Sequence, residues 1–417
     1  MDNTSHRTLL ILGAGIDQYY PIKVAKEEGL RVLTVDSNPN SPCFKFADEV
    51  SVVSNRDINA IKKLCDDSSY RGFPVVGVLV MGTDIPHIAA ELASYLNIPG
   101  PTIETGILTT NKYLMKSVLS KAGVAVPWFA LISNFTMLQR LMQQHGGKTF
   151  VIKPTDRSGA RGVFIVSPTH PDLKDLFLQA QLESYSGEVI LEEFIEGNQI
   201  STESILWQGK AYTPGFVDRN YEMLERFAPS VIENGGIHPS EITDLLKVKI
   251  KCLVEQAALA LGIVNGVAKG DVVIANDGTP MIIEMAARLS GGDFSESLIP
   301  LGCGVNIVKV AIQIATGNVP NISELNDRME KYVANRYFFG LPGRLISIRG
   351  LEDVRALPWV SKLEVYVKPG DIIKQIRFHA GRLGVFIVTA ENRNELLERI
   401  QVVYDLVRFD IDSEVQK

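Results

Sequence analysis

The sequence predicts a mixed fold, α/β in its first part and α+β in the rest. Residues 1 to about 100 alternate strand-like and helix-like segments, which is typical of a doubly wound parallel sheet. From Phe129 the pattern changes to short strands separated by hairpin-like breaks. The length agrees with such a division, because 417 residues exceed what one hydrophobic core usually holds.

The composition is that of a soluble globular protein, with 46% hydrophobic and 22% charged residues. No apolar run reaches the ~18 residues that a membrane-spanning helix needs. The N-terminal stretch lacks the basic start and the cleavage site of a secretory signal. We therefore expect no membrane partner and a cytoplasmic location.

Charge and cysteine content exclude two further classes. The net charge of −6 offers no long-range attraction to a polyanion, so nucleic acid is not expected as the main partner. The four cysteines, Cys43, Cys65, Cys252 and Cys303, contain no C-x-x-C pair, which argues against a zinc site or a disulfide scaffold. We expect buried thiols.

The first part has a clear order of elements. "TLLILG" at 8–13 predicts a strand, a periodic stretch from about 20 to 28 predicts a helix, and "LRVLTVD" predicts a second strand ending in Asp36. "VVGVLVMG" and the helical "IPHIAAELASYLNI" follow. The turn-rich "NIPGPTIETG" then predicts a domain boundary near residue 100.

The second part contains hairpins and two longer helices. Helices are expected at about 111–122 and 240–261, and strands at "TFVIKP", "GVFIVS", "EVILEEFI" and "QISTESILWQGKAY". "GVAKGDVVIAND" and "PMIIEMAA" flank Asn276, Asp277 and Gly278, a strong hairpin signal. "RLISIRG", "LEVYVKPG", "GVFIVTA" and a last helix predict a small α+β cap.

The glycine-rich "GAGID" after the first strand is a weak signal for a dinucleotide. Asp36 lies where dinucleotide folds keep a ribose-binding acid, but Gln18 replaces the third glycine of the G-x-G-x-x-G pattern. A tight turn in a doubly wound domain is favoured over a nicotinamide site.

"FVIKPTDRSGARGVFIV" at 150–166 predicts a phosphate-binding hairpin. A strand delivers Lys153, and small residues in the following loop expose backbone N–H groups that suit phosphate oxygens. The alternative is an ordinary hairpin with a mobile tip. The loop residues concerned are Ser158, Gly159, Ala160, Arg161 and Gly162.

"VILEEFIEGNQISTE" at 189–203 predicts a strand that runs into a short irregular link. Adenine needs one acceptor and one donor, which residues 192–195 could supply. Taken alone, solvated strand charges at Glu192 and Glu193 are the favoured interpretation.

Asp271 and Glu284 carry the strongest prediction. Counted outward from the Asn276 to Gly278 turn, they fall close to facing positions on adjacent antiparallel strands. Two adjacent carboxylates repel each other unless a cation lies between them, and Mg²⁺ prefers one or two carboxylates with phosphate oxygens and water. Arg288 could hold a phosphoryl group or a carboxylate. The alternative is a surface hairpin with incidental charges.

Taken together, these motifs resemble the ATP-grasp superfamily of ligases, in the arrangement shared by the biotin carboxylase and amino-acid ligase branches. The resemblance implies a nucleotide-fold domain at 1–104 and a two-lobed ATP-grasp domain at 105–318, with lobes at 105–200 and 201–318. A C-terminal α+β cap is implied at 319–417.

The resemblance also implies roles for single residues. Lys112 and Lys153 would contact ATP phosphates, and the loop at 156–162 would close over them. Ala286 stands where many members have a metal-binding Asn, so the third protein ligand is in doubt. The implied nucleotide contacts further include Glu192, Glu193, Ile195, Gln199 and Glu203, the metal ligands are Asp271 and Glu284, and Arg288 is at the reacting phosphate, followed by the glycine turn with Gly291 and Gly292.

The implied reaction uses ATP and Mg²⁺, with Mn²⁺ as the alternative metal. A carboxylate would be activated as an acyl phosphate and attacked by an amine, with amino acids as the expected small-molecule substrates. Arg226 and His238, in a Pro- and Gly-rich segment, are candidates for the recognition of substrate side chains. Gly291 and Gly292 are further candidates for contact with the substrate.

Other activities and an oligomeric state stay open. The rival activities are a carboxylase-type reaction, a purine-pathway ligation, a dehydrogenase and a silent nucleotide-binding regulator. The apolar first domain and the resemblance are compatible with a homodimer.

Overall fold

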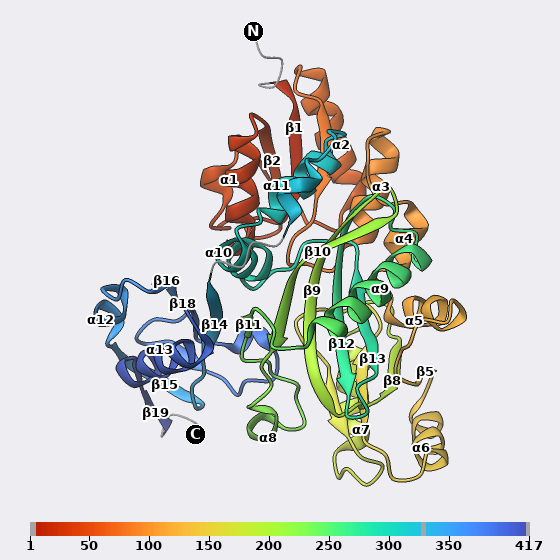
Figure 1. The fold of residues 1–417 in the computed structure, drawn as a ribbon, viewed down its shortest axis with the longest axis vertical. Helices are drawn as coiled ribbons and strands as arrows, with labels where there is room; N and C mark the ends of the chain where they lie inside the picture. The colour runs from red at the N-terminus through yellow and green to blue at the C-terminus, as the bar shows by residue number, and fades with distance from the viewer. Residues whose placement is uncertain (1–5, 327–330, 414–417) are drawn as a thin grey trace. The chain divides into compact units, whose positions relative to one another are not determined.

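The computed structural model describes residues 6–326 and 331–413. The chain divides into two compact units. Their helices and strands are labelled in Figure 1. The first unit comprises residues 1–126, 201–216 and 242–328, and the second comprises residues 127–200, 217–241 and 329–417. The predicted domain boundaries after residues 104 and 318 stay predictions.

A four-stranded parallel sheet opens the first unit, in the strand order β3-β2-β1-β4. β1 is buried over its whole length, as expected for a central parallel strand that is covered on both faces. One face packs against α2 and α3 in an apolar core, and α1 packs with α11. The ranges are β1 (Thr8–Leu12), α1 (Tyr19–Glu27), β2 (Arg31–Asp36), β3 (Glu49–Val52), α2 (Ile58–Tyr70), β4 (Val75–Leu79), α3 (Pro86–Leu96) and α11 (Ile307–Ala315).

The doubly wound sheet predicted for the N-terminal part is thereby confirmed. β3 and α2 are additional to the elements expected from the sequence. β3 is a four-residue edge strand with alternating exposure, so it lacks the long apolar run that marks its neighbours.

The "GAGID" turn is filled by its own side chains. Gln18 is buried and donates from Nε2 to the Met81 carbonyl at 2.7 Å. Asp36 accepts a hydrogen bond from the Ala14 N–H at 2.9 Å. The acid that could have bound a ribose therefore stabilises the turn itself, which agrees with the favoured structural interpretation.

A hairpin forms the second part of the first unit. β12 and β13 pair antiparallel around the predicted turn, where Gly278 has a φ of 83° that only glycine adopts readily. The hairpin is part of a sheet whose strands in this unit have the order β13-β12-β9-β10. α9 packs on the hairpin. The ranges are α4 (Ile103–Leu108), α5 (Lys112–Lys121), β9 (Gly197–Trp207), β10 (Lys210–Arg219), α9 (Asp244–Ala260), β12 (Gly266–Ala275), β13 (Pro280–Ala286) and α10 (Ile299–Cys303).

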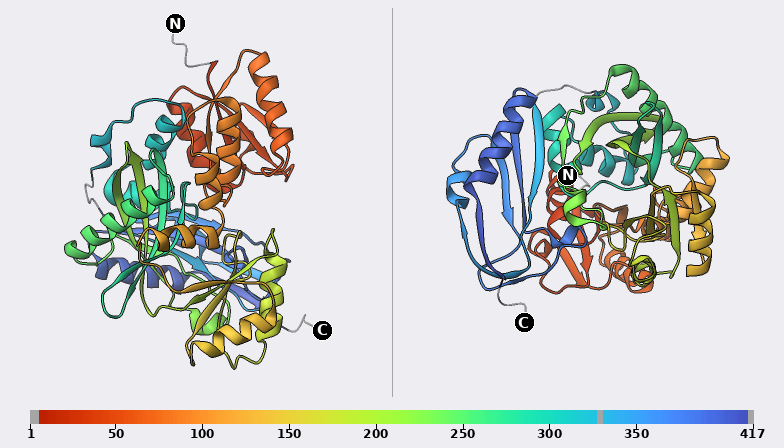
Figure 2. Two further views of the ribbon diagram at one scale, coloured as in Figure 1. Left: turned by 90° about the vertical axis from the view of Figure 1, so that its right-hand side faces the viewer. Right: turned by 90° about the horizontal axis from the view of Figure 1, so that it is seen from below.

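The second unit begins with a four-stranded antiparallel sheet in the order β5-β8-β6-β7 (yellow in Figure 2). Two helices, α6 and α7, pack on it through one apolar core. The predicted hairpin that carries Lys153 is formed by β6 and β7. The ranges are β5 (Phe129–Ile132), α6 (Phe135–Gln144), β6 (Phe150–Pro154), β7 (Phe164–Val166), α7 (Leu173–Glu183) and β8 (Val189–Glu193).

The C-terminal part of the second unit is the predicted α+β cap (blue in Figure 2). Strands β11-β14-β18-β16 pair in this order, and a smaller sheet has the order β17-β15-β19. α13 and α12 share an apolar core with both sheets. The cap elements are β14 (Tyr332–Phe338), β15 (Gly343–Arg349), α12 (Leu351–Arg355), β16 (Val360–Val365), β17 (Ile372–Ile373), β18 (Gly384–Ala390), α13 (Arg393–Leu406) and β19 (Arg408–Asp412). Two elements of the second unit, α8 (Leu224–Phe227) and β11 (Gly236–His238), come earlier in the chain than the predicted cap.

Candidate functional site

The two hairpin carboxylates face each other in the first unit. Asp271 on β12 is the direct cross-strand partner of Glu284 on β13, and a bulge follows immediately after this pair. Asp271 is buried and Glu284 is half-buried. The burial of Asp271 argues against the alternative of a surface hairpin with incidental charges.

Each carboxylate has an ammonium partner. Lys112, at the first turn of α5, places its Nζ 3.2 Å from Oε1 of Glu284, and its side chain is 6% exposed. Lys269 forms an ion pair with Oδ2 of Asp271, while the Ser201 hydroxyl donates to Oδ1 at 2.7 Å. Sequence reasoning missed Lys269, although its position two residues before Asp271 puts both side chains on one face of the strand.

Arg288 is held by an acid that the sequence did not point to. Its Nε and Nη2 both donate to Oδ1 of Asp84, at 2.9 and 2.6 Å. Burial raises the pKa of Asp84, but the positive charges of Arg288, Lys112 and Lys269 outweigh burial and lower it to about 2. Asp84 is therefore a carboxylate at neutral pH. These four charged groups form one largely buried cluster with Glu284, which pairs with Lys112.

Glu203 lies against the glycine turn that follows Arg288. It is fully buried on β9, and its Oε1 accepts a hydrogen bond from the Ser290 N–H at 3.1 Å. Burial raises the pKa of Glu203, and hydrogen bonds from Ser290 and Ser295 offset this only in part. The nucleotide contact predicted for Glu203 stays a prediction, because the observed hydrogen bond comes from the backbone N–H of Ser290.

The glycine turn is packed tightly on the end of β4. A Cβ added at Gly291 would lie 2.4 Å from Oδ2 of Asp17 and 2.6 Å from the Cα of Gly82. Gly292 has a positive φ of 64°. The close approach of the backbone thus explains the glycine at 291, and the positive φ explains the glycine at 292. Their predicted contact with substrate stays a prediction.

The second unit carries the predicted adenine and phosphate residues. The Nζ of Lys153 on β6 lies 2.8 Å from Oε1 of Glu192 on β8, and both side chains are nearly buried. Glu193 pairs instead with Lys148 at 2.6 Å. Ile195 lies in the link between β8 and β9 and makes no hydrogen bond within the described ranges, so its backbone groups are available to a ligand.

The loop after Lys153 has three residues in the left-handed region of backbone conformation. Gly159, Ala160 and Gly162 have positive φ values of 66, 59 and 67°. Within residues 6–326 and 331–413, the N–H groups of these three residues and of Ser158 donate to no protein acceptor. Successive N–H groups of this kind bind phosphate oxygens.

Both ends of this loop are anchored. Asp156 accepts hydrogen bonds from the Ser184 hydroxyl at 2.8 Å and the Ser186 N–H at 2.8 Å. On the other side the Gly159 carbonyl accepts from the His379 N–H at 3.1 Å, and the Arg161 guanidinium lies 5.3 Å from the ring centroid of Phe378.

The remaining candidates are dispersed. Gln199 is half-buried at the start of β9, and His238 is buried on β11. Arg226 is exposed on α8, with its guanidinium 5.2 Å from the Phe227 ring centroid. Nothing in these placements tests the substrate roles of Arg226 and His238.

The chemistry of the acid pair fits one divalent metal ion. Two facing carboxylates offer the oxygen ligands that Mg²⁺ prefers. Among the residues that the structure describes, no group of three or more His, Cys, Asp or Glu side chains could hold a metal ion. Ala286, at the position where the resemblance implied a further metal ligand, is buried and apolar.

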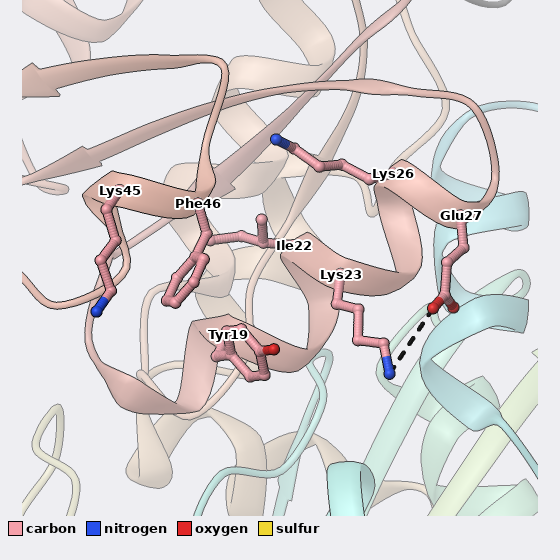
Figure 3. Close-up of a pocket in the computed structure, with 7 residues that line it drawn as sticks. All are labelled: Tyr19, Ile22, Lys23, Lys26, Glu27, Lys45 and Phe46. Carbon is pink, nitrogen blue, oxygen red and sulfur yellow. Dashed lines mark ion pairs between the residues drawn. The ribbon is translucent and has the colours of Figure 1, made fainter.

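A separate cavity of about 470 Å³ lies on the first unit (Figure 3). It is formed by α1 and the segment after β2, and none of the predicted site residues lines it. Its lining residues are Tyr19, Ile22, Lys23, Lys26, Glu27, Lys45 and Phe46. In the described part of the chain, no helix is long and apolar enough to cross a membrane.

Comparison with known proteins identifies two parts of the chain. Residues 109–292 match the ATP-grasp domain, and residues 336–412 match the L-amino acid ligase C-terminal domain 2. The L-arginine-specific L-amino acid ligase of Bacillus subtilis is 23% identical over 320 residues, which cover 75% of this chain and 74% of that protein.

Two solved structures share the fold. The L-amino acid ligase from Bacillus licheniformis matches with a TM-score of 0.83 at 20% identity, over 98% of this chain and 99% of that one. The phosphoribosylglycinamide synthetase from Anaerococcus prevotii matches with a TM-score of 0.73 at 21% identity, over 97% of this chain and 100% of that one. The resemblance to ATP-grasp enzymes, and the class of ATP-dependent ligase that forms a C–N bond, are thereby confirmed.

Proposed function

We propose that this ATP-grasp chain joins the carboxylate of one amino acid to the amine of another and releases ADP and phosphate. The observation that carries the proposal is the buried cluster in the first unit, where Asp271 and Glu284 face each other beside Lys112 and Arg288. The match of residues 336–412 to the L-amino acid ligase C-terminal domain 2 and the similarity to an L-amino acid ligase favour amino acids as substrates.

The reaction would proceed in two steps. A carboxylate oxygen of the first substrate attacks the γ-phosphorus of ATP, the bond to the β-phosphate oxygen breaks, and ADP leaves. The amine of the second substrate then attacks the carbonyl carbon of the acyl phosphate. The C–O bond breaks, phosphate leaves with that oxygen, and the amine loses a proton.

The chain's own residues would supply charge and position. Arg288, oriented by Asp84, would stabilise the charge on the transferring phosphoryl group. In the first unit Lys112 would neutralise phosphate charge, and in the second unit Lys153 would have the same role. Positioning and charge neutralisation are the main requirements of phosphoryl transfer, so no nucleophilic side chain is needed.

Asp271 and Glu284 would hold the divalent cation, with Mg²⁺ as the expected ion. When bound, such an ion neutralises phosphate oxygens and orients the γ-phosphate. The loop with Ser158, Gly159 and Gly162 would donate N–H groups to the phosphates and exclude water from the acyl phosphate.

The existing ion pairs are part of the proposal. Lys112 pairs with Glu284 and Lys153 pairs with Glu192, so the charges are satisfied before the nucleotide binds. Nucleotide and metal would exchange these partners, which keeps buried charges compensated in both states.

The second substrate is the least constrained part of the proposal. We retain His238, buried on β11, and Arg226, exposed on α8, as candidates for substrate recognition. We also retain a homodimer, because Val50 and Val52 on the edge strand β3 are 45% and 56% exposed.

A matrix assay tests the proposal. The protein and Mg·ATP are incubated with single amino acids, amino-acid pairs, bicarbonate or glycine with a phosphorylated sugar amine, and phosphate release is measured with mass spectrometry of the products. Phosphate release that requires two amino acids, with a dipeptide mass, supports the proposal. Release with bicarbonate alone, or with the sugar amine, would assign a carboxylase-type or purine-pathway reaction instead.

A further inference from the structure

Lys269 is the charged residue of the acid cluster that the proposed reaction does not use. It lies on β12 two residues before Asp271, so both side chains extend from the same face of the strand. Its direct cross-strand partner on β13 is Ala286, just as Glu284 is the partner of Asp271. The small Ala286 side chain leaves the space beside the acid pair to the lysine.

The lysine ammonium is already bound to one of the acids. Nζ of Lys269 forms an ion pair with Oδ2 of Asp271, and the two side chains are 13% and 7% exposed. The other oxygen of Asp271 accepts from the Ser201 hydroxyl. Both oxygens of Asp271 therefore have protein partners, whereas Glu284 is engaged by Lys112.

This arrangement limits how many divalent ions the pair can take. A second divalent ion would need further oxygen ligands, and the described residues offer no third carboxylate or histidine near enough to form a metal site. It would also have to lie next to the buried Lys269 ammonium, and like charges a few ångströms apart repel strongly in a poorly solvated site. One divalent ion needs fewer oxygen ligands, and it places a single divalent charge rather than two beside the ammonium.

We propose that the Lys269 ammonium takes the place of a second divalent cation, so that the acid pair binds a single metal ion together with the nucleotide. This inference rests on the proposed function, because it assumes that Asp271 and Glu284 hold a metal–nucleotide complex. Lys269 is accordingly a positioning residue. Its ammonium adds one positive charge to the site and holds one oxygen of Asp271 in place.

Binding of Mn²⁺ tests the inference without any turnover. The wild-type protein is saturated with a non-hydrolysable ATP analogue and titrated with MnCl₂, and bound Mn²⁺ is measured by electron paramagnetic resonance. We expect one bound Mn²⁺ per nucleotide with no signal from coupled ions. Two bound ions per nucleotide in the wild-type protein would overturn the inference.

Variants of Lys269 and of its cross-strand partner Ala286 complete the test. Lys269→Met combined with Ala286→Asn removes the ammonium and adds an oxygen ligand, and we expect a second bound Mn²⁺ per nucleotide. Lys249→Met, at an exposed position on α9, is the matched control and should keep one. A double variant that folds, as judged by its thermal unfolding, and still binds one Mn²⁺ would contradict the inference.

The same titration separates the inference from the function on which it rests. If the wild-type protein binds no nucleotide-dependent Mn²⁺, or if Glu284→Gln leaves that binding unchanged, the metal assignment itself falls and the inference falls with it. If Glu284→Gln removes the binding but the wild-type protein holds two ions, only the role of Lys269 is wrong.

Discussion

Asp84 fixes the orientation of Arg288 by accepting two hydrogen bonds from its guanidinium on a single oxygen, Oδ1. The acid follows β4 of the parallel sheet, and the arginine follows β13 of the hairpin, 204 residues further along the chain. The doubly wound sheet therefore contributes directly to the proposed catalytic cluster. It positions the group that we expect at the reacting phosphate.

Replacing Asp84 by Asn should lower kcat by about 10- to 100-fold, because Arg288 loses the charge that orients it. Nucleotide affinity should change little, since the hydrogen bonds of Asp84 go to Arg288 and not to Asp271 or Glu284. Steady-state kinetics with a nucleotide-binding titration measures both. Asp67→Asn, on the exposed end of α2, is the matched control. Wild-type kcat in the Asp84 variant would show that Arg288 needs no such support.

Replacing Glu203 by Gln should stabilise the protein at high pH and not at low pH. Burial raises the pKa of Glu203 above its unfolded value of about 4.3, so ionised Glu203 destabilises the folded state as pH rises above that value. The variant removes this cost. Its Tm should exceed that of the wild type at pH 8, and the difference should shrink as pH falls toward about 4.

The Asp84 variant gives the opposite pH behaviour. The pKa of Asp84 is lowered to about 2, so its stabilising contribution is complete above about pH 4 and is lost only as pH falls through the folded pKa. The Tm difference between Asp84→Asn and the wild type should be constant from pH 5 to pH 8. A difference that varies over this range would contradict the assignment of Asp84 as a carboxylate paired with Arg288.

Two variants separate the structural role of the Lys153–Glu192 ion pair from the proposed role of Lys153 in nucleotide binding. Lys153→Met should destabilise the protein by about 3–5 kcal/mol, because the buried carboxylate of Glu192 loses its ion pair with Lys153. Lys153→Met with Glu192→Gln should recover most of the stability, measured by urea unfolding. Nucleotide binding should stay weak in both variants. Normal ATP affinity in the stable double variant would mean that Lys153 does not contact phosphate.

Gly291→Ala should destabilise the first unit by about 1–3 kcal/mol, because the added methyl group meets Asp17 and the backbone of Gly82. The control is Gly15→Ala, where the added Cβ meets only the end of the Gln18 side chain at 3.2 Å. Equal thermal unfolding of the two variants would show that the turn can move away from β4.

The parts of the site that follow local rules could be predicted from the sequence. The Asn276 to Gly278 turn fixes the hairpin register, and with it the facing positions of Asp271 and Glu284. Lys153 could be placed because a strand and a glycine-rich loop adjoin it. The strand β3 could not be predicted, because a short edge strand with alternating polar residues carries little periodic signal.

The partners of the site residues depend on long-range packing. Asp84 follows a predicted strand, yet nothing in its neighbourhood indicates that Arg288 lies beside it. Lys269 could have been found from its spacing to Asp271, but its significance depends on Ala286 across the hairpin. The metal-binding pair could therefore be predicted from the sequence. The charged residues that compensate the pair could not.

Transfer of oxygen from the substrate to phosphate tests the central claim most directly. The reaction is run with an amino acid whose carboxylate is labelled with ¹⁸O, and the released phosphate is analysed by mass spectrometry. An acyl phosphate formed by attack of the carboxylate on ATP predicts one ¹⁸O atom in each phosphate. Unlabelled phosphate released together with a labelled amide product would contradict it.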